Sequence, residues 1–297
     1  MRLVVALGGN ALLKRGEPLD VTIQRRNVAA AALSLASLAR QHEIVITHGN
    51  GPQVGLLALQ AEAYKETTPY PLDVLGAESE GMVGYLLEEG LTRVLPERDV
   101  VSLLTRVEVD PADPAFQRPT KPIGPHYSDA DAKRLAAERG WAFAPDGPNM
   151  RRVVSSPKPR RIFGGRVLRR LVDAGVLVIC AGGGGIPVGA DGQGLEAVID
   201  KDWTAALLAQ ELKADGLLLL TDVEGVFENF RAPSAALIRT STPDQLSRLS
   251  FEEGSMAPKV AAACRFVEST GRWAAIGRLE DAAAVACGAS GTRIERR

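Results

Sequence analysis

The chain has 297 residues, 45% of them hydrophobic, and can therefore bury a substantial core, either as one large α/β domain or as two lobes. Its formal net charge of −1 at pH 7 gives no overall electrostatic attraction to nucleic acid. Apolar runs such as residues 176–181 fall far short of the roughly 18 residues of a membrane helix, so we expect a soluble, cytoplasmic protein.

Six short apolar runs are typical of β-strands: residues 3–7, 44–47, 100–104, 176–180, 217–221 and 273–277. The first is too short for a signal peptide and leads directly into Gly8-Gly9, as a strand leads into a turn. Residues 21–40, 53–65, 203–213 and 260–269 favour helices by composition. This alternation predicts a largely parallel sheet with helices on both faces.

Three glycine-rich loops follow predicted strands: Gly8-Gly9-Asn10, Gly49-Asn50-Gly51 and Gly182-Gly183-Gly184-Gly185. Pro52 suits the first position of a helix, whose positive end would face Gly49-Asn50-Gly51. A single such loop is more often only a tight turn, but three that converge would form an anion-binding floor of backbone N–H groups. None matches the P-loop or the dinucleotide-binding pattern, so any nucleotide is held by another arrangement.

Residues 110–165 interrupt the alternation and contain nine of the chain's 18 prolines. Because proline lacks an N–H donor, we expect that this stretch is not a regular sheet layer. The pattern predicts an insertion that projects from the first lobe, with one short helix over Asp129–Arg139. Structureless loops of this length are uncommon unless functional, which favours an active-site lid or a small subdomain.

Three lysines lie near these features. Lys201 stands between Asp200 and Asp202, Lys121 is flanked by prolines, and Lys259 follows Pro258 at the start of a predicted helix. A lysine alone is most often a solvated side chain, but beside glycine loops the three suit phosphoryl transfer, where negative charge spreads over the transferring oxygens. The two aspartates would keep the ammonium groups protonated and oriented.

The histidines, the cysteines and the basic stretch at residues 151–170 indicate less about function. His48 could touch a substrate or be a hydrogen-bonded structural imidazole; we expect His42 to be exposed and assign no role to His126. Cys180, Cys264 and Cys287 are far apart in apolar stretches and predict reduced core thiols rather than a disulfide or zinc framework. Eight basic residues between 151 and 170, with no acidic residue, favour a solvated face or a rim that attracts anionic substrates over a nucleic-acid patch.

Taken together, the motifs resemble those of carbamate kinases, within the amino-acid kinase superfamily. They are VVALGGNA at residues 4–11, THGNGPQVG at 47–55, DPAD at 110–113, PTKPIGP at 119–125, SPKP at 156–159, GGGGIP at 182–187, EAVIDKD at 196–202 and GSMAPK at 254–259. The resemblance runs from the first predicted strand to the last. Asn10 after Gly8-Gly9 is the form seen in carbamate kinases, whereas related acid kinases usually carry a lysine ahead of the paired glycines.

The resemblance implies one amino-acid kinase domain over residues 1–297, with an open, mainly parallel eight-stranded sheet sandwiched between helices. Residues 1 to about 180 would form an N-terminal lobe for carbamate or carbamoyl phosphate, including a protruding lid subdomain over about 110–165. Residues from about 181 to 297 would form the nucleotide-binding lobe. The resemblance also implies reversible phosphoryl transfer between ATP and carbamate, often toward ATP in arginine catabolism, and a homodimeric assembly.

Residue roles follow from the same resemblance. Lys121, Lys201 and Lys259 would stabilise charge, and Asp202, in preference to Asp200, would orient them. Gly8, Gly9 and Asn10 would contact the transferring phosphoryl group, and Gly49, Asn50 and Gly51 would hold carbamate. The nucleotide would lie against Gly183, Gly184, Thr221, Asp222, Val223, Met256 and Pro258. Magnesium would bridge the nucleotide phosphates, since no carboxylate cluster suggests a metal cage built by the protein.

Two other readings stay open on the sequence. One is a related kinase that acts on another small acid or phosphate. The other is a catalytically silent sensor of nucleotide or carbamoyl phosphate, which would be expected to have lost a lysine or a glycine loop. This chain retains both.

Overall fold

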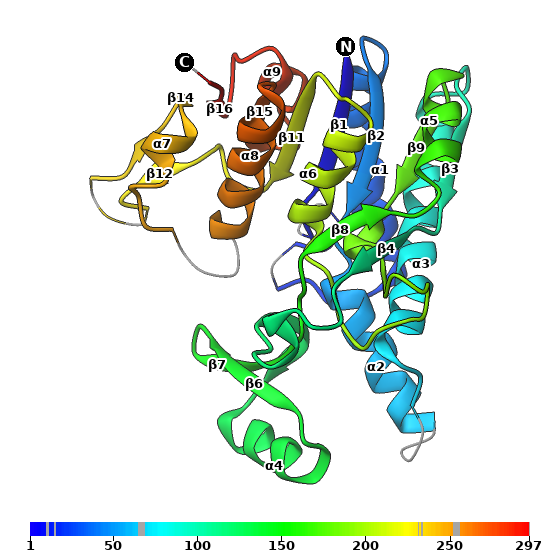
Figure 1. Cartoon of the computed structure of the whole chain (residues 1–297), viewed down its shortest axis with the longest axis vertical. Helices are drawn as coiled ribbons and strands as arrows, with labels where there is room; N and C mark the ends of the chain where they lie inside the picture. Colours follow the sequence, from blue (N-terminus) through cyan, green and yellow to red (C-terminus); the bar gives the residue numbers. More distant parts are fainter. Residues whose placement is uncertain are drawn as a thin grey trace.

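The main body of the molecule is built on an eight-stranded sheet (Figure 1). The computed structural model describes residues 1–9, 12–14, 16–64, 69–230, 232, 234–251 and 256–296. In spatial order the strands are β14 (Thr240–Ser241), β16 (Thr292–Ile294), β15 (Trp273–Arg278), β11 (Gly216–Thr221), β1 (Arg2–Leu7), β2 (Glu43–His48), β9 (Leu177–Cys180) and β3 (Val100–Leu103). Neighbouring strands are parallel except β15 and β16. All six predicted strands lie in this sheet, and the α/β prediction is confirmed.

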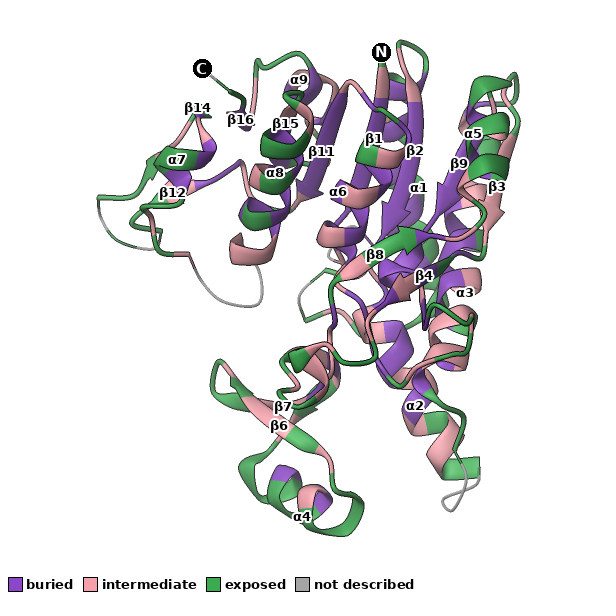
Figure 2. Ribbon diagram, viewed as in Figure 1, coloured by how far each residue is buried: buried purple, intermediate pink, exposed green. Residues whose placement is uncertain are grey.

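Helices cover both faces of the sheet because successive strand residues point to opposite sides. Val4 and Ala6 of β1 pack with α5 (Gly165–Asp173), α6 (Lys201–Glu211) and α8 (Met256–Thr270). Leu3, Val5 and Leu7 pack with α1 (Val21–Ala39), α3 (Leu72–Val94) and α9 (Ala282–Ala286). Figure 2 shows the resulting buried centre along the central strands.

Shorter elements complete the fold around the main sheet. A three-stranded sheet contains β10 (Ile186–Val188), β4 (Arg106–Val109) and β8 (Pro159–Ile162). Short 3-10 helices occur at η2 (Pro114–Phe116) and η3 (Gly182–Gly184). A hairpin of β12 (Phe227–Glu228) and β13 (Ala236–Leu237) precedes α7 (Pro243–Leu246).

The protruding subdomain contains a sheet, contrary to our expectation for the proline-rich stretch. Its strands are β5 (Lys121–Tyr127), β7 (Asn149–Val154) and β6 (Ala142–Asp146), in the spatial order β5–β7–β6. Prolines are tolerated because they lie in the two outer strands, and the β5 register shifts between Ile123 and His126, around Pro125. The predicted helix is confirmed as α4 (Asp129–Arg139), which begins after a Ser128 cap.

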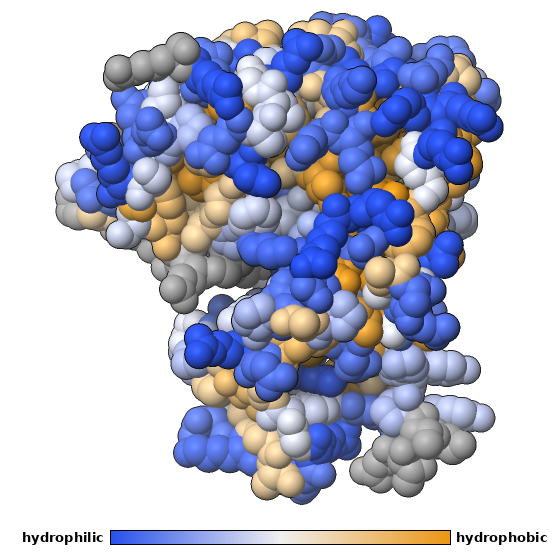
Figure 3. Space-filling view, in the orientation of Figure 1, coloured by the Kyte–Doolittle hydropathy of each residue, from blue (hydrophilic) through white to orange (hydrophobic). Residues whose placement is uncertain are grey.

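The subdomain is anchored on helix α2 (Gly51–Tyr64). A Cβ atom at Gly55 would lie only 2.0 Å from the Gly124 Cα, so glycine is required for the backbones of α2 and β5 to approach this closely. At the far end of α2, Glu62 pairs with Arg139 and lies 3.8 Å from Arg152. Figure 3 shows the molecular surface indented between this subdomain and the body above it.

The basic stretch between residues 151 and 170 is partly compensated by acidic side chains. Four of its arginines pair with acidic side chains from neighbouring elements: Arg151 with Asp146, Arg152 with Glu62, Arg160 with Asp110 and Arg161 with Glu108. Four of the eight basic residues of the stretch are therefore paired with carboxylates within the fold.

The cysteines also differ from expectation, since only Cys180 is buried, Cys264 is half-buried and Cys287 is exposed. His42 is half-buried rather than exposed. Within the described ranges, every helix is too short or too polar to cross a membrane.

Candidate active site

The first turn of α6 positions the central lysine. Asp200 caps this helix, and its Oδ1 accepts hydrogen bonds from the backbone N–H groups of Asp202 at 2.9 Å and Trp203 at 3.4 Å. The Thr204 hydroxyl donates to the carbonyl oxygen of Gly184 at 2.9 Å, which ties the same turn to the four-glycine loop. Lys201 and Asp202 are therefore held in a rigid helical turn.

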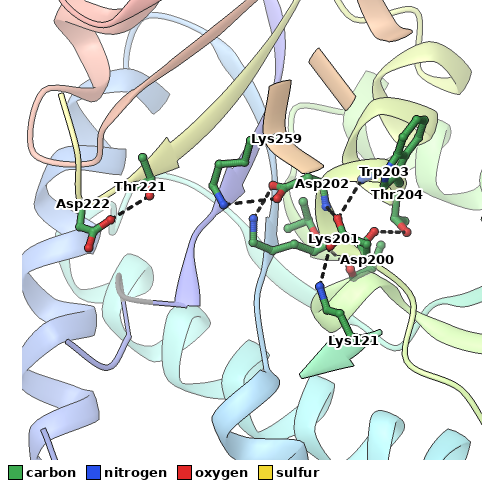
Figure 4. A network of polar contacts seen from close by, with 11 residues as sticks. Lys121, Asp200, Lys201, Asp202, Trp203, Thr204, Thr221, Asp222 and Lys259 are labelled. Atoms are coloured by element: carbon green, nitrogen blue, oxygen red, sulfur yellow. Dashed lines mark hydrogen bonds and ion pairs between the residues drawn. The ribbon is translucent and has the colours of Figure 1, made fainter. Parts of the chain in front are cut away.

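Three lysines from three elements meet at two aspartates (Figure 4). Lys201 Nζ lies 2.5 Å from Asp202 Oδ1, and Lys259 Nζ, from α8, lies 3.4 Å from Asp202 Oδ2. Lys121 Nζ, from β5, lies 2.5 Å from Asp200 Oδ2. The sequence analysis favoured Asp202 over Asp200 as the partner of the lysines, whereas the structure places both there.

Burial and charge act against each other in this cluster. Lys201 and Lys259 are each 8% exposed and Asp202 is 3% exposed. Desolvation lowers the pKa of Lys201, while the attraction of Asp202 opposes this shift. Burial alone would raise the pKa of Asp200, but Lys121 and Lys201 hold it below its ordinary value. The cluster contains more lysines than aspartates, which suits an anion.

Two glycine loops meet directly beside Lys201. Strands β1 and β2 are adjacent, and the Gly49 N–H donates to the Leu7 carbonyl oxygen at 3.1 Å. A Cβ atom at Gly49 would lie 3.3 Å from the Gly9 N and 3.5 Å from the Lys201 Cδ. Gly8 continues the ladder by donating to the Leu220 carbonyl oxygen at 2.8 Å. The predicted convergence is present for these residues, whereas Asn10 lies outside the described residues.

The Asn50-Gly51 segment begins helix α2. Asn50 Nδ2 donates to the Ser79 hydroxyl at 2.8 Å, which fixes the amide on α3. Pro52 is the second helical residue rather than the first. Among the described residues outside its own helix, only the Pro122 carbonyl oxygen, at 4.0 Å, would lie near a Cβ atom at Gly51, so space remains in front of this residue.

Gly183 and Gly184 are buried and pressed against other segments. Both have positive φ, +67° and +97°. A Cβ atom would lie 2.1 Å from Asn50 Nδ2 at Gly183 and 2.4 Å from the Ile199 carbonyl oxygen at Gly184. Packing thus explains both glycines, and their contact with nucleotide remains a prediction.

The other predicted nucleotide residues lie at the end of β11 and the start of α8. Thr221 Cα lies 3.6 Å from the Cβ position of Gly8, and its hydroxyl donates to Asp222 at 3.0 Å. Val223, Met256 and Pro258 are half-buried. In Figure 4 the Thr221–Asp222 pair lies on the other side of Lys259 from the aspartates.

Sequence reasoning missed a buried polar layer beneath the loops. Glu80 of α3 is 1% exposed and accepts hydrogen bonds from the N–H groups of Gly182 at 2.9 Å and Thr105 at 3.2 Å. Burial raises its pKa to about 8. A signal was present, because Glu80 precedes Val83 and Leu87 at helical spacing and so falls on the apolar stripe of α3.

His48 is the structural imidazole of the two alternatives. It is fully buried, and its Nδ1 lies 3.2 Å from the Gly49 carbonyl oxygen. Desolvation lowers its pKa to about 4, so the ring is neutral near pH 7. The neutral ring supports the Gly49 turn from below.

Residues 1–277 match the amino acid kinase family model. A carbamate kinase of Rhizobium meliloti (strain 1021) is 54% identical, with 99% of this chain and 93% of the relative aligned. A carbamate kinase of Escherichia coli (strain K12) is 51% identical over 98% of each chain. The chain belongs to the carbamate kinases of the amino acid kinase family.

Solved carbamate kinase structures agree with this membership over the full length. The carbamate kinase from Giardia lamblia bound to AMP-PNP is 38% identical, with a TM-score of 0.90 and alignment over 100% of this chain and 98% of that one. The same enzyme bound to citric acid gives a TM-score of 0.93. The eight-stranded sheet and its helices are thus those of the carbamate kinase fold.

Proposed function

We propose that this chain is a carbamate kinase, which transfers a phosphoryl group reversibly between ATP and carbamate. The observation that carries the proposal is the cluster of Lys121, Lys201 and Lys259 on two aspartates, with Lys201 packed against Gly49. Relatives that bear this name match nearly the whole chain at 51–54% identity.

In the proposed reaction a carbamate oxygen attacks the γ-phosphorus of ATP. The bond from that phosphorus to the bridging oxygen breaks, and its electron pair leaves on the terminal phosphate of ADP. Negative charge spreads over the transferring oxygens, where Lys201 and Lys259 would stabilise it from a largely desolvated position. Gly8, Gly9 and Asn10 would contact this phosphoryl group.

The two aspartates have different proposed tasks. Asp202 would hold Lys201 and Lys259 at a fixed separation, since each of its oxygens contacts one ammonium group. Asp200 would hold Lys121 in the absence of nucleotide and release it to an incoming phosphate, which competes for the same ammonium group. Gly49, Asn50 and Gly51 would bind carbamate at the start of α2, where backbone N–H groups are available.

ATP or ADP would lie against Thr221, Asp222, Val223, Met256 and Pro258, with Gly183 and Gly184 behind the phosphates. Within the described ranges there is no group of three or more acidic, histidine or cysteine side chains that could hold a metal ion. Asp200 and Asp202 are already paired with lysines. Magnesium would therefore arrive on the nucleotide, where it neutralises phosphate charge.

We also propose a cytoplasmic homodimer that runs toward ATP in arginine catabolism. Carbamoyl phosphate is a mixed anhydride, which favours transfer to ADP. For the dimer, Tyr85 of α3 and Leu104 beyond β3 are 56% and 61% exposed. Leu104 Cδ2 lies 3.8 Å from the Cβ position of Gly81, and Tyr85 follows Gly81 by about one turn of α3. Sedimentation equilibrium tests this, because alanine at both positions would shift a dimer toward monomer.

The decisive experiment is a set of parallel assays with the purified protein. ADP is supplied with carbamoyl phosphate, and ATP with acetylglutamate, aspartate or isopentenyl phosphate. We expect ATP formation from carbamoyl phosphate to exceed turnover of every other acceptor by orders of magnitude. Turnover of another acid alone would assign the chain to a related kinase, and nucleotide binding without turnover would indicate a sensor.

A further inference from the structure

A fourth lysine touches the turn that carries Lys201. Lys158 is the last residue of the returning limb, residues 155–158, by which the chain leaves the protruding subdomain. Its Nζ lies 3.3 Å from the centroid of the Trp203 ring, well within the range of a cation–π contact. Trp203 is the third residue of α6, directly after Lys201 and Asp202.

The backbone of the returning limb is held on both sides. The Lys158 N–H donates to Asp113 Oδ2 at 3.0 Å, and Asp113 belongs to the outgoing limb, residues 110–120. The Val198 N–H donates to the Ser155 carbonyl oxygen at 2.9 Å, so the limb runs beside the segment that leads into Asp200. The Lys158 ammonium group is thus directed onto Trp203 by a fixed backbone.

The two limbs reach the same helical turn by different contacts. Lys121, at the start of β5, reaches it through Asp200, at 2.5 Å. Lys158 reaches it through the ring of Trp203. The backbone N–H of Trp203 donates to Asp200 Oδ1, the oxygen that Lys121 does not contact. Asp200 also attracts the Lys158 ammonium group, although the two are not in direct contact. When Lys121 leaves Asp200 for a phosphate, the stack on Trp203 still joins the subdomain to α6.

We propose that Lys158 is a positioning residue for phosphoryl transfer, which, stacked on Trp203, holds the returning limb on α6 and so keeps Lys121 within reach of the Lys201–Lys259 pair. The idea rests on the proposed kinase function. It requires a cation at position 158 and an aromatic ring at position 203, and it does not require Lys158 to touch substrate.

The test compares Lys158→Met, Lys158→Arg and Trp203→Leu with wild type. Lys133→Met is the matched control, because Lys133 is an exposed lysine of the same subdomain that pairs with its helical neighbour Asp129. We expect Lys158→Met and Trp203→Leu each to lower kcat about tenfold with little change in KM for carbamoyl phosphate. Lys158→Arg should keep most of the wild-type kcat. The double variant with Lys158→Met and Trp203→Leu should have a kcat no lower than that of either single variant.

Amide exchange measured without substrates separates this idea from the proposed function. Residues 155–158 and the start of β5 should exchange faster in Lys158→Met than in Lys133→Met. A kcat within twofold of wild type for Lys158→Met, or an arginine variant as impaired as the methionine one, would overturn the role. If wild type shows no carbamate kinase turnover, the proposed function fails and amide exchange alone decides. Faster exchange in Lys158→Met would support the role of the Lys158–Trp203 stack in holding residues 155–158 on α6, and unchanged exchange would refute it.

Discussion

Lys201 combines a buried charge with a fixed direction. Its stem lies against Gly49 and its ammonium group on Asp202. We expect Lys201→Ala to lower turnover by about 10² to 10³, the usual cost of losing one stabiliser of a transition-state anion. Lys201→Met, which retains the stem, should lose as much, because the charge is what matters.

This prediction is checked by steady-state kinetics at saturating substrates together with the melting temperature. Lys133→Ala removes an exposed lysine outside the site and serves as the control for the loss of a lysine in general. More than a tenth of wild-type turnover in either Lys201 variant would show that this lysine does not carry the chemistry.

Glu80 and His48 should give stability an unusual dependence on pH. Folded Glu80 keeps its proton up to a pKa of about 8, against an ordinary 4.5, so its contribution to the free energy of unfolding is lost as pH rises through this interval. Folded His48 has a pKa of about 4 against 6.5, so its contribution is lost as pH falls. The two trends oppose each other between 4.5 and 6.5, and above 6.5 Glu80 acts alone.

Glu80→Gln replaces the titratable carboxyl group with a neutral amide of nearly the same shape. Between pH 6.5 and 8, the free energy of unfolding of wild type, measured by thermal unfolding, should fall by ~2 kcal/mol, and the fall for the variant should be smaller by that amount. The variant itself should be less stable at pH 6, because a single amide oxygen replaces two acceptors for the Gly182 and Thr105 N–H groups. Parallel pH curves for the two proteins would mean that Glu80 is ionised in the fold.

The charged residues of the site could be anticipated from the sequence, whereas the partners of the buried polar layer beneath them could not. Lys201, Asp200 and Asp202 stand together in the chain, and glycine loops after strands mark where parallel strands end. Glu80 contacts Gly182 across 102 residues, and nothing local announces such a partner. The role of Asp200 as a helix cap depended on where α6 begins, which the sequence analysis placed two residues later.

At the level of elements, one helix and one sheet were not predicted from the sequence. Helix α3 is absent from the predicted helices, and its glycines have a packing role, since a Cβ at Gly84 would lie 2.0 Å from Ser102 Oγ and one at Gly90 2.8 Å from Val28 Cγ1. These glycines permit close packing rather than a turn. Prolines suggested the absence of a sheet, although outer strands accept them.

The contact between α2 and β5 predicts the effect of one methyl group. Gly55→Ala would place a Cβ 2.0 Å from the Gly124 Cα, so the β5 backbone must shift and carry Lys121 with it. We expect a lower melting temperature and a lower kcat. Gly76→Ala is the matched control, since among the described residues no atom outside its own helical backbone lies within 4 Å of its added Cβ, and alanine favours a helix by about 0.5–1 kcal/mol. Equal behaviour of the two variants would contradict this account.

The protruding subdomain is proposed to close on ligand. Because Gly55 and Gly124 join it to α2, closure should move both elements together. Amide exchange of residues 110–165 and of α2 should therefore slow when ADP and a carbamoyl phosphate analogue are bound. Protection confined to either element, with both ligands shown to be bound, would argue for separate motions.

At the scale of the whole molecule, the proposal assigns the two substrates to different lobes. Gly51→Ala tests this assignment because the protein leaves room for the methyl group, 4.0 Å from the nearest atom, and the φ of Gly51 is not positive. We expect affinity for carbamoyl phosphate to fall about tenfold or more, while affinity for ADP stays within about twofold, as for a methyl group that intrudes on a small ligand.

Separate titrations with each ligand decide the outcome. Gly183→Ala is the contrasting variant, since its Cβ would meet Asn50 and its φ is +67°, so the melting temperature should fall. An equal loss of both affinities in Gly51→Ala, at unchanged melting temperature, would show that the substrates are not divided between the lobes in this way.

Helix α2 has a consequence for the order of events in a catalytic cycle. It begins at Gly51, in the loop proposed to hold the small acid, and one turn later Gly55 meets Gly124, three residues after Lys121. A nucleotide that draws Lys121 inward would therefore also tighten the proposed acid pocket, and a bound acid would restrain Lys121. Thermodynamic reciprocity then requires each substrate to strengthen the other by the same factor. Such coupling would favour the filled ternary complex and leave a nucleotide bound alone in an incomplete site, poorly arranged for transfer to water.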